Sequence, residues 1–490
     1  MLKPKTIENQ KFSIIKLVEV LFYTFPLWFI VGNLAVNINT LLFIIVSLIL
    51  IKKEQLTFRF NNLNWLLIIF FSYFFISTTI HYLNPGILND RLGHFSLENN
   101  PIFKSFMLVR FLILIIVLDT LFFNKILGFK KLFLSSLICT SFVSFDVILQ
   151  YLIGLDLFGF KTLYTWNSGP FGDEKITTTF LKNFSFFSFF YIFETYNNKN
   201  FSKILFIFII TLHLLAALLA GNRMPMILFL FGCLMIIFFI KNLRIIMSLS
   251  LIIFASFFFL LIKNDKNFNH AYGVLFFDIN IARLITNNKN VDTKPKKNIE
   301  GKIIENDVKK KDAASKKSVG LIPRSVIFLR HSGYNRVYNT SIMMWKERPL
   351  TGFGLKSFRF KCWDMLEKDN IERKISKRPQ KIVCANHAHN YYLELLSEAG
   401  IIGTSLLLIF FLILLKNSFH YLKKYKQQIN YDINFLAPVI ILFFLEIWPL
   451  KSTGSFFTTW GATFFWINVG LLITGISKNP FNSRFESFVK

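Results

Sequence analysis

Long apolar segments of similar length fill most of the sequence. A helix needs about 20 consecutive apolar residues to cross a bilayer, because each residue rises about 1.5 Å through a hydrocarbon core about 30 Å thick. Twelve such segments are expected: 14–33, 35–51, 63–81, 103–123, 132–153, 178–196, 203–221, 224–240, 244–262, 397–416, 434–450 and 456–476. A water-soluble domain of 490 residues, 53% of them hydrophobic, could not bury so much apolar surface. We therefore predict an all-α, polytopic membrane protein with about 12 transmembrane helices.

Short basic links between these segments indicate the side that faces the cytoplasm, because Lys and Arg in short loops are retained there. With twelve spans, all such links fall on one face, together with both chain termini. The links are Lys52-Lys53, Lys125 with Lys130-Lys131, Lys199 with Lys203, Lys241 with Arg244, and 416–426. We therefore predict that both termini are cytoplasmic. The opposite, outer face then receives 81–102, 154–177, 221–223, 263–385 and 451–454.

One long loop on the outer face divides the chain. We expect an N-terminal bundle of about nine helices over 1–262, an outer loop with interfacial helices over 263–396, and about three helices over 397–490. Residues 263–385 carry 27 Lys and Arg against 12 Asp and Glu, a net charge of +15. Loops longer than about 60 residues are largely exempt from the orientation rule. The middle of the loop, 287–318, is Lys-rich and nearly free of aromatic residues, so it is predicted to be disordered.

The whole chain has a net charge of +28, from 56 Lys and Arg against 28 Asp and Glu. In a soluble protein this excess would favour nucleic acid as a partner. Here the charges lie mostly between apolar segments, where orientation and attraction to anionic lipid headgroups account for them. No nucleic-acid recognition motif accompanies the charge. We therefore expect membrane lipids, and no nucleic acid, as partners.

The densest polar cluster runs from Ala385 to Gly403, where the outer loop re-enters the membrane. Its His389 can accept and return a proton near neutral pH, so it is a candidate catalytic residue. An interfacial His without a chemical task is the simpler alternative. A metal site at His387 and His389 is a further alternative, but it lacks a convincing third and fourth ligand.

Helical spacing predicts how the side chains of this cluster are oriented. It places His389 and Leu393 on one helix face. A neighbouring stripe holds Asn390, Glu394 and Glu398. On this interpretation the His side chain opens onto the outer interface while the rest of the cluster anchors the helix.

Two groups of arginines are candidate anion contacts. Arg223 lies in a tight outer turn before a helix with Pro225 in its first turn, and helix N-termini favour phosphate. Binding of lipid headgroups by a snorkelling Arg is the alternative. Arg330 and Arg336 lie in the outer loop, and Arg336 begins an amphipathic stretch that ends in a Pro/Gly turn. The run Gly352-Phe-Gly354 is too short for a dinucleotide fingerprint and is interpreted as a turn.

Cysteines and buried acids complete the set of candidates. Cys139 and Cys233 lie in apolar segments and are expected to be small buried hydrophobes. Cys362 and Cys384 both lie in the outer loop, where oxidation is permitted, so they are a candidate disulfide. Three acids lie within apolar segments, where partnered structural roles are favoured over a proton path: Asp119, Asp146 and Glu446.

These motifs occur in an order that resembles the O-antigen ligase / O-antigen polymerase superfamily. An outer Arg between two spans is followed by an Arg…Trp…Pro-Leu-Thr-Gly-Phe-Gly run. The motif His389-Asn390…Leu393…Glu398-Ala-Gly400-Ile-Ile-Gly403 comes next. The resemblance is strongest over about 325–405, and the twelve-span layout extends it to the whole chain.

The resemblance implies a metal-independent glycosyltransferase of the GT-C type, without a cofactor, at the outer face of the bacterial inner membrane. Its donor would be a glycan on undecaprenyl diphosphate, and its acceptor a sugar hydroxyl of lipid A–core. By the same resemblance, His389 matches the general base and Arg223 the donor-diphosphate contact. Arg336 matches a second such contact, with Arg330 less favoured for it. Asn390 and Glu398 would support the site.

Two alternatives to a ligase stay open. An O-antigen polymerase would use the same residues and donor but a lipid-linked repeat unit as acceptor. A non-catalytic lipid-glycan transporter or scaffold is expected to carry polar residues at the midplane of discontinuous helices. The polar candidates here cluster at the outer interface instead, which favours the enzyme.

Overall fold

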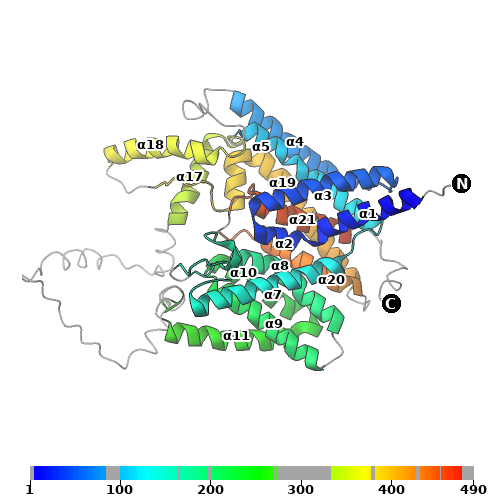
Figure 1. Ribbon diagram of the computed structural model, residues 1–490. Coiled ribbons are helices and arrows are strands. Elements are labelled where there is room, and N and C mark those ends of the chain that lie inside the picture. Colours follow the sequence, from blue (N-terminus) through cyan, green and yellow to red (C-terminus); the bar gives the residue numbers. More distant parts are fainter. Residues whose placement is uncertain are drawn as a thin grey trace, which may run out of the picture. The chain divides into compact units, whose positions relative to one another are not determined.

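Figure 1 shows a computed structural model of the chain, which describes residues 5–83, 100–163, 166–196, 200–265, 268–269, 272, 333–376, 381–425, 431–452 and 454–476. Contacts within the chain define two units, Met1–Phe258 with Val337–Lys490, and Phe259–Arg336. The contacts described below lie within the first unit. The described residues form helices and no strand, with isolated bridges at Leu155↔Lys161 and Leu163↔Trp166.

The helices follow one another along the whole described chain. They are α1 Lys5–Tyr23, α2 Phe25–Val31, α3 Asn33–Lys53, α4 Asn62–Leu83, α5 Pro101–Met107, α6 Val109–Phe123, α7 Phe129–Ile153, α8 Thr177–Tyr196, α9 Asn200–Leu219, α10 Arg223–Phe239, α11 Arg244–Asn264, α17 Gly333–Glu347, α18 Phe358–Ser376, α19 Tyr391–Tyr425, α20 Tyr431–Ile447 and α21 Thr459–Ile476, with short 3-10 helices at Gly169–Phe171 and Lys241–Leu243.

The predicted fold class is confirmed: the protein is an all-α, polytopic membrane protein. Each of the twelve predicted segments overlaps at least one helix. In the described part of the chain, 7 helices are long and apolar enough to cross a membrane. The number rises to 8 if α1 and α2, which meet at a bend of 55°, form one span. The count of twelve spans stays a prediction.

Helix α21 forms the centre of the bundle. Of this helix, 83% is buried, against 17% for the segment Lys241–Asn264 that contains α11. The indole of Trp466 is fully buried and contacts aromatic rings from several other helices. These rings belong to Phe71 of α4, Phe111 of α6 and Phe410 of α19, with centroids 5.4–6.3 Å from that of Trp466. The middle of α19, at Phe410, is therefore packed against this core.

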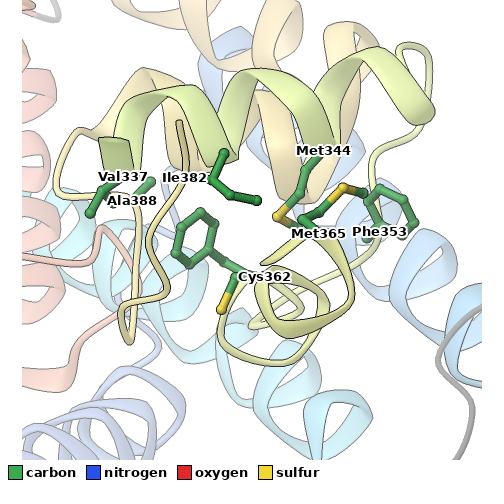
Figure 2. Close-up of a cluster of buried hydrophobic side chains, with 8 residues drawn as sticks. Val337, Met344, Phe353, Cys362, Met365, Ile382 and Ala388 are labelled. Carbon is green, nitrogen blue, oxygen red and sulfur yellow. The ribbon is translucent and has the colours of Figure 1, made fainter. Parts of the chain in front are cut away.

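Two helices of the outer loop have their own small core. The buried face of α17 includes Val337, Ser341 and Met344, which recur at the i, i+4, i+7 spacing of an amphipathic helix. Figure 2 shows that Val337 and Met344 share one apolar cluster with Met365 of α18 and with Ala388. Ala388 precedes His389, so this cluster connects the outer helices to the candidate site.

Helix α19 begins earlier than the predicted span and is broken inside it. The backbone of Gly400 has φ 64° and ψ −168°, which no helix residue adopts. The break leaves carbonyl groups before it and N–H groups after it without helical partners. Such groups cost several kcal/mol each when they are buried away from water.

The loop Pro349–Gly354 supplies the missing hydrogen bonds. Phe353 N and Gly354 N donate to the carbonyls of Ser397 (3.1 Å) and Glu398 (2.8 Å). In the other direction, the N–H groups that follow the break donate to the loop. These bonds are Ile401 N to Pro349 O (2.8 Å) and Ile402 N to Leu350 O (3.2 Å). The loop thus supplies hydrogen-bond partners to the backbone groups that the break leaves without helical ones. The predicted turn at Gly352-Phe-Gly354 forms part of this loop.

Helix α4 holds the same loop from the other side. Leu355 N donates to the hydroxyl of Thr78 (3.0 Å), and Ser77 donates to the carbonyl of Thr351 (3.3 Å). Tyr73 donates to the carbonyl of Ala399 at the break (2.8 Å). The loop is therefore fixed between two membrane helices.

We predict that Gly400→Ala destabilises the protein. A Cβ at Gly400 would overlap the carbonyl group of Leu350, and the left-handed φ disfavours any side chain. The free energy of unfolding should fall by about 2–4 kcal/mol. A lower thermal unfolding midpoint of the purified protein in detergent would show this. Gly454→Ala is the control, because a Cβ there meets nothing within 4 Å. Equal midpoints for the two variants would contradict the account.

Candidate active site

His389 lies in the short segment between the outer helices and α19. Its backbone has φ 55°, in the left-handed region that few residues other than glycine adopt, although His is among the types that tolerate it. On one side, Ala388 is fully buried in the apolar cluster. On the other side, Asn390 is bonded to the membrane helices. The imidazole lies beside that of His387, with ring centroids 4.1 Å apart.

The expectation that His389 and Leu393 share a helix face is wrong. Helix α19 begins at Tyr391, two residues after His389. Asn390 acts as the N-cap: its side-chain oxygen accepts from Tyr392 N (3.0 Å) and Leu393 N (3.2 Å). An N-cap residue has non-helical backbone angles, so the residue before it lies outside the helix. His389 is thus oriented by a turn and not by helical periodicity.

Asn390 also bonds the turn between α20 and α21. Its side-chain amide donates to the carbonyls of Pro449 (3.0 Å) and Lys451 (3.2 Å). Tyr392 donates its hydroxyl proton to the carbonyl of Ile447, the last residue of α20, directly before that turn. The residues that follow His389 are therefore attached to a second part of the bundle.

Glu398 is a structural support for the outer helices. Its carboxylate accepts from Lys356 N (2.8 Å) and Phe358 N (3.4 Å), at the start of α18. The first N–H groups of a helix lack helical partners, and the side-chain oxygens of Glu398 supply acceptors at this helix start. Glu398 is 1% exposed, so it acts inside the protein and not on a substrate. Its supporting role thus consists of fixing α18 on α19.

Lys356 joins Glu394 to the same network. Its ammonium donates to Ser455 Oγ (2.9 Å), and that hydroxyl donates to the Glu394 carboxylate, which also accepts from Phe456 N (2.7 Å). Burial lowers the pKa of Lys356, and the Glu394 and Glu398 carboxylates oppose that shift. A buried charge is tolerated only when it is paired in this way.

A second buried charge cluster consists of Lys182, Glu446 and Lys451. Each is at most 5% exposed. Glu446 forms ion pairs with Lys182 and with Lys451, the latter at 3.1 Å. Lys451 also donates to the carbonyl of Leu445 (3.0 Å). Burial lowers the pKa of Lys451 to about 8, against the opposing effect of Glu446.

The other two acids in apolar segments also have partners. Asp119 lies 3.7 Å from Arg59 and accepts from Asn61 at 3.4 Å. Asp146 accepts from Leu157 N at 2.8 Å. Each of the three acids singled out in the sequence therefore has a structural partner.

Arg223 is the first residue of α10 and is exposed. Asn222 before it donates its side-chain amide to the carbonyl of Lys175, which ties the turn to the outer segment before α8. Pro225 is the third residue of the helix, as expected for its first turn. The first N–H groups of α10 and the guanidinium of Arg223 thus belong to one anchored turn, a suitable arrangement for a phosphate.

Arg336 lies in the first turn of α17 and belongs to the second unit. Arg330 and the Lys-rich segment 287–318 lie outside the described residues. The structure places His389 directly before α19, Asn390 at the N-cap of that helix, and Glu398 further along the same helix, where it bonds to the start of α18. The joint use of Arg223 and Arg336 stays a prediction.

Several charged residues near the site were not predicted from the sequence. Arg348, which directly precedes the loop Pro349–Gly354, donates to Nδ1 of His81 at the end of α4 (2.8 Å). Lys182 could have been found, because it is a cation inside an apolar segment that needs a partner such as Glu446. Lys356 and Lys451 gave no such signal, since both lie in polar turns.

Cys362 of α18 and Cys384 are joined as a disulfide, with their Cα atoms 5.3 Å apart. Cys362 also belongs to the apolar cluster of the outer helices (Figure 2). Within the described part of the chain, no group of three His, Cys, Asp or Glu side chains is arranged to hold a metal ion.

The fold and site belong to a polytopic membrane protein whose polar groups gather around the start of one broken helix. Residues 206–408 match the family model described as O-antigen ligase. This region of the chain is similar to the O-antigen ligase superfamily, and the match indicates an enzyme of the glycosyltransferase or ligase type. The match includes Arg223, Arg336 and His389. No curated protein matches the chain.

We expect the disulfide between Cys362 and Cys384 to be present in the protein isolated from membranes. Mass spectrometry without reductant should find the two peptides linked. Cys139 and Cys233, which are buried as free thiols, serve as internal controls for alkylation after unfolding. Alkylation of both Cys362 and Cys384 without reductant would contradict the pairing.

Proposed function

We propose that the protein transfers a glycan from undecaprenyl diphosphate to a sugar hydroxyl of lipid A–core, at the periplasmic face of the bacterial inner membrane. The O-antigen ligase match and the construction of the segment around His389 support this proposal. The reaction is a metal-independent displacement that needs no cofactor and inverts the anomeric configuration of the donor.

The observation that carries the proposal is the fixed backbone on both sides of His389. Ala388 is held in the core of the outer helices, and Asn390 is held by α19 and the α20–α21 turn. A non-glycine residue held in a left-handed conformation is typical of functional sites, where the surroundings enforce it. An imidazole on such a segment is preorganised for proton transfer.

The chemistry follows from the charges of the reacting groups. The acceptor hydroxyl gives its proton to the neutral imidazole of His389 as its oxygen bonds to the anomeric carbon of the donor. The bond from that carbon to the diphosphate breaks, and undecaprenyl diphosphate leaves with the electron pair. Arg223 and Arg336 stabilise the growing negative charge by bidentate hydrogen bonds, with Arg330 less favoured than Arg336.

The proposed orientation is supported by contacts between segments assigned to the same side. Asn390 and Lys451, both assigned to the outer side, are hydrogen-bonded to each other (3.2 Å). Asn124 and Thr57, both assigned to the cytoplasmic side, are also bonded to each other (3.0 Å). We infer that both termini are cytoplasmic and that the site is periplasmic.

The break in α19 does not favour a transporter over an enzyme. Transporters use the free backbone groups of discontinuous helices to bind ions and substrates. Here the groups at Gly400 are satisfied by the loop Pro349–Gly354, as described above. They are therefore not available to a ligand.

A polymerase differs from a ligase only in its acceptor. The outer-loop architecture favours the ligase. The same assay separates them when lipid A–core and a lipid-linked repeat unit are offered as alternative acceptors.

We predict that His389→Ala lowers the rate of glycan transfer by about 10²–10⁴-fold, because the hydroxyl loses its proton acceptor. The assay uses purified protein, a lipid-diphosphate-linked glycan and acceptor. His420→Ala is the matched control, since His420 is an exposed residue near the other end of α19. Full transfer by His389→Ala would show that the catalytic assignment is wrong.

Arg223→Lys should raise the KM for the donor about tenfold, because Lys keeps the charge but loses the bidentate fork. Arg244→Lys is a suitable control, as Arg244 is the first residue of α11 but belongs to a link assigned to the cytoplasmic side. An unchanged donor KM would remove Arg223 from the site.

A further inference from the structure

The buried cluster of Lys182, Glu446 and Lys451 has no part in the reaction described above. Charges inside a membrane protein are costly, and they are usually retained for a function. Lys182 lies on α8 and Glu446 at the end of α20, 264 positions apart in sequence. Lys451 lies in the α20–α21 turn. The cluster therefore fixes that turn against two helices.

Lys451 holds the turn at its own end of α20. Its ammonium donates to the carbonyl of Leu445 (3.0 Å) and to Glu446 (3.1 Å). The carbonyls at a helix C-terminus lack helical partners, and a cation beside them is favourable. These bonds direct the chain back on itself directly after α20. The ammonium also lies 4.9 Å from the ring centroid of Tyr391, the first residue of α19.

The α20–α21 turn and the end of α20 hold the residues that follow His389. Asn390 donates to two carbonyls of the turn, and Tyr392 donates to that of Ile447 at the end of α20. Tyr391 packs against Phe456, which lies between Lys451 and the start of α21, with ring centroids 5.1 Å apart. Three consecutive residues after His389 are thus bound by the segment that Lys451 holds in place.

We propose that Lys451, fixed by Glu446 and Lys182, is a positioning residue for His389. This inference rests on the proposed function of His389 as the proton acceptor. Lys451 acts through Asn390: when the turn shifts, the Asn390 cap shifts with it, and the imidazole leaves its productive position. The donor is bound elsewhere, so its affinity does not depend on this chain of contacts.

The test is a double-mutant cycle in the transfer assay, with Lys451→Met and Asn390→Ala. Each single variant should lower kcat about 10- to 100-fold, because displacement of a catalytic group by about 1 Å has effects of this size. The KM for the donor should stay within about twofold. If Lys451 acts through Asn390, the double variant loses no more than the worse single variant.

Two further variants separate positioning from general damage. Lys451→Arg keeps a charged donor for Glu446 and should recover part of kcat. Lys131→Met is the matched control, because Lys131 is a 62% exposed lysine paired with Glu19 at 2.8 Å. It should have the activity of the unmodified protein. Where Lys451→Met fails to fold, Tyr392→Phe takes its place in the cycle, since it removes one bond to the end of α20, where the turn begins.

Three results would overturn the inference: an unchanged kcat, single effects that multiply in the double variant, or a loss that appears mainly in donor KM. Each is distinguishable from failure of the proposed function. If the proposed function itself were wrong, His389→Ala would keep full activity, whatever the activities of the Lys451 variants.

Discussion

The structure depends on the hydrogen bonds that one loop supplies to a broken membrane helix. At Gly400 the backbone of α19 leaves its helical path, and the loop Pro349–Gly354 replaces the lost hydrogen bonds in both directions. Unsatisfied backbone groups are not tolerated in a membrane, so loop and helix stabilise each other. The loop connects α17 to α18, and the half-helix before Gly400 begins just after His389. The outer helices and the candidate base are therefore held in a fixed relation by the same hydrogen bonds.

Buried charge pairs complete this arrangement around the first turns of α19. Six ionisable groups take part: Lys182, Lys356, Lys451, Glu394, Glu398 and Glu446. The set contains three lysines and three glutamates, and buried ionisable groups of this kind are tolerated when they are paired and hydrogen-bonded. Each group also bonds to backbone or to a hydroxyl, or pairs with another member of the set. Lys356 and Lys451 bond to groups in or beside the α20–α21 turn. Asn390, next to His389, bonds to the same turn.

Much of the fold could be predicted from the sequence, because a span of about 20 apolar residues is a strong signal. The turn at Gly352-Phe-Gly354 was predicted from glycine spacing. The break at Gly400 was not predicted, since Gly-Ile-Ile-Gly within an apolar run is compatible with a continuous helix. Helical spacing misplaced His389, because it cannot show that Asn390 caps the helix. The pairing of Lys182 with Glu446 depends on tertiary contacts that no local pattern reveals.

The central claim is that His389 and Arg223 act on one substrate at the outer face. The most direct test is an electron cryo-microscopy structure of the protein in lipid nanodiscs with a lipid-diphosphate-linked glycan. The account predicts the diphosphate at the N-terminus of α10, in contact with Arg223. The imidazole of His389 should then lie about 3 Å from the position of an attacking hydroxyl at the anomeric carbon. A diphosphate bound away from Arg223, or a sugar out of reach of His389, would contradict it.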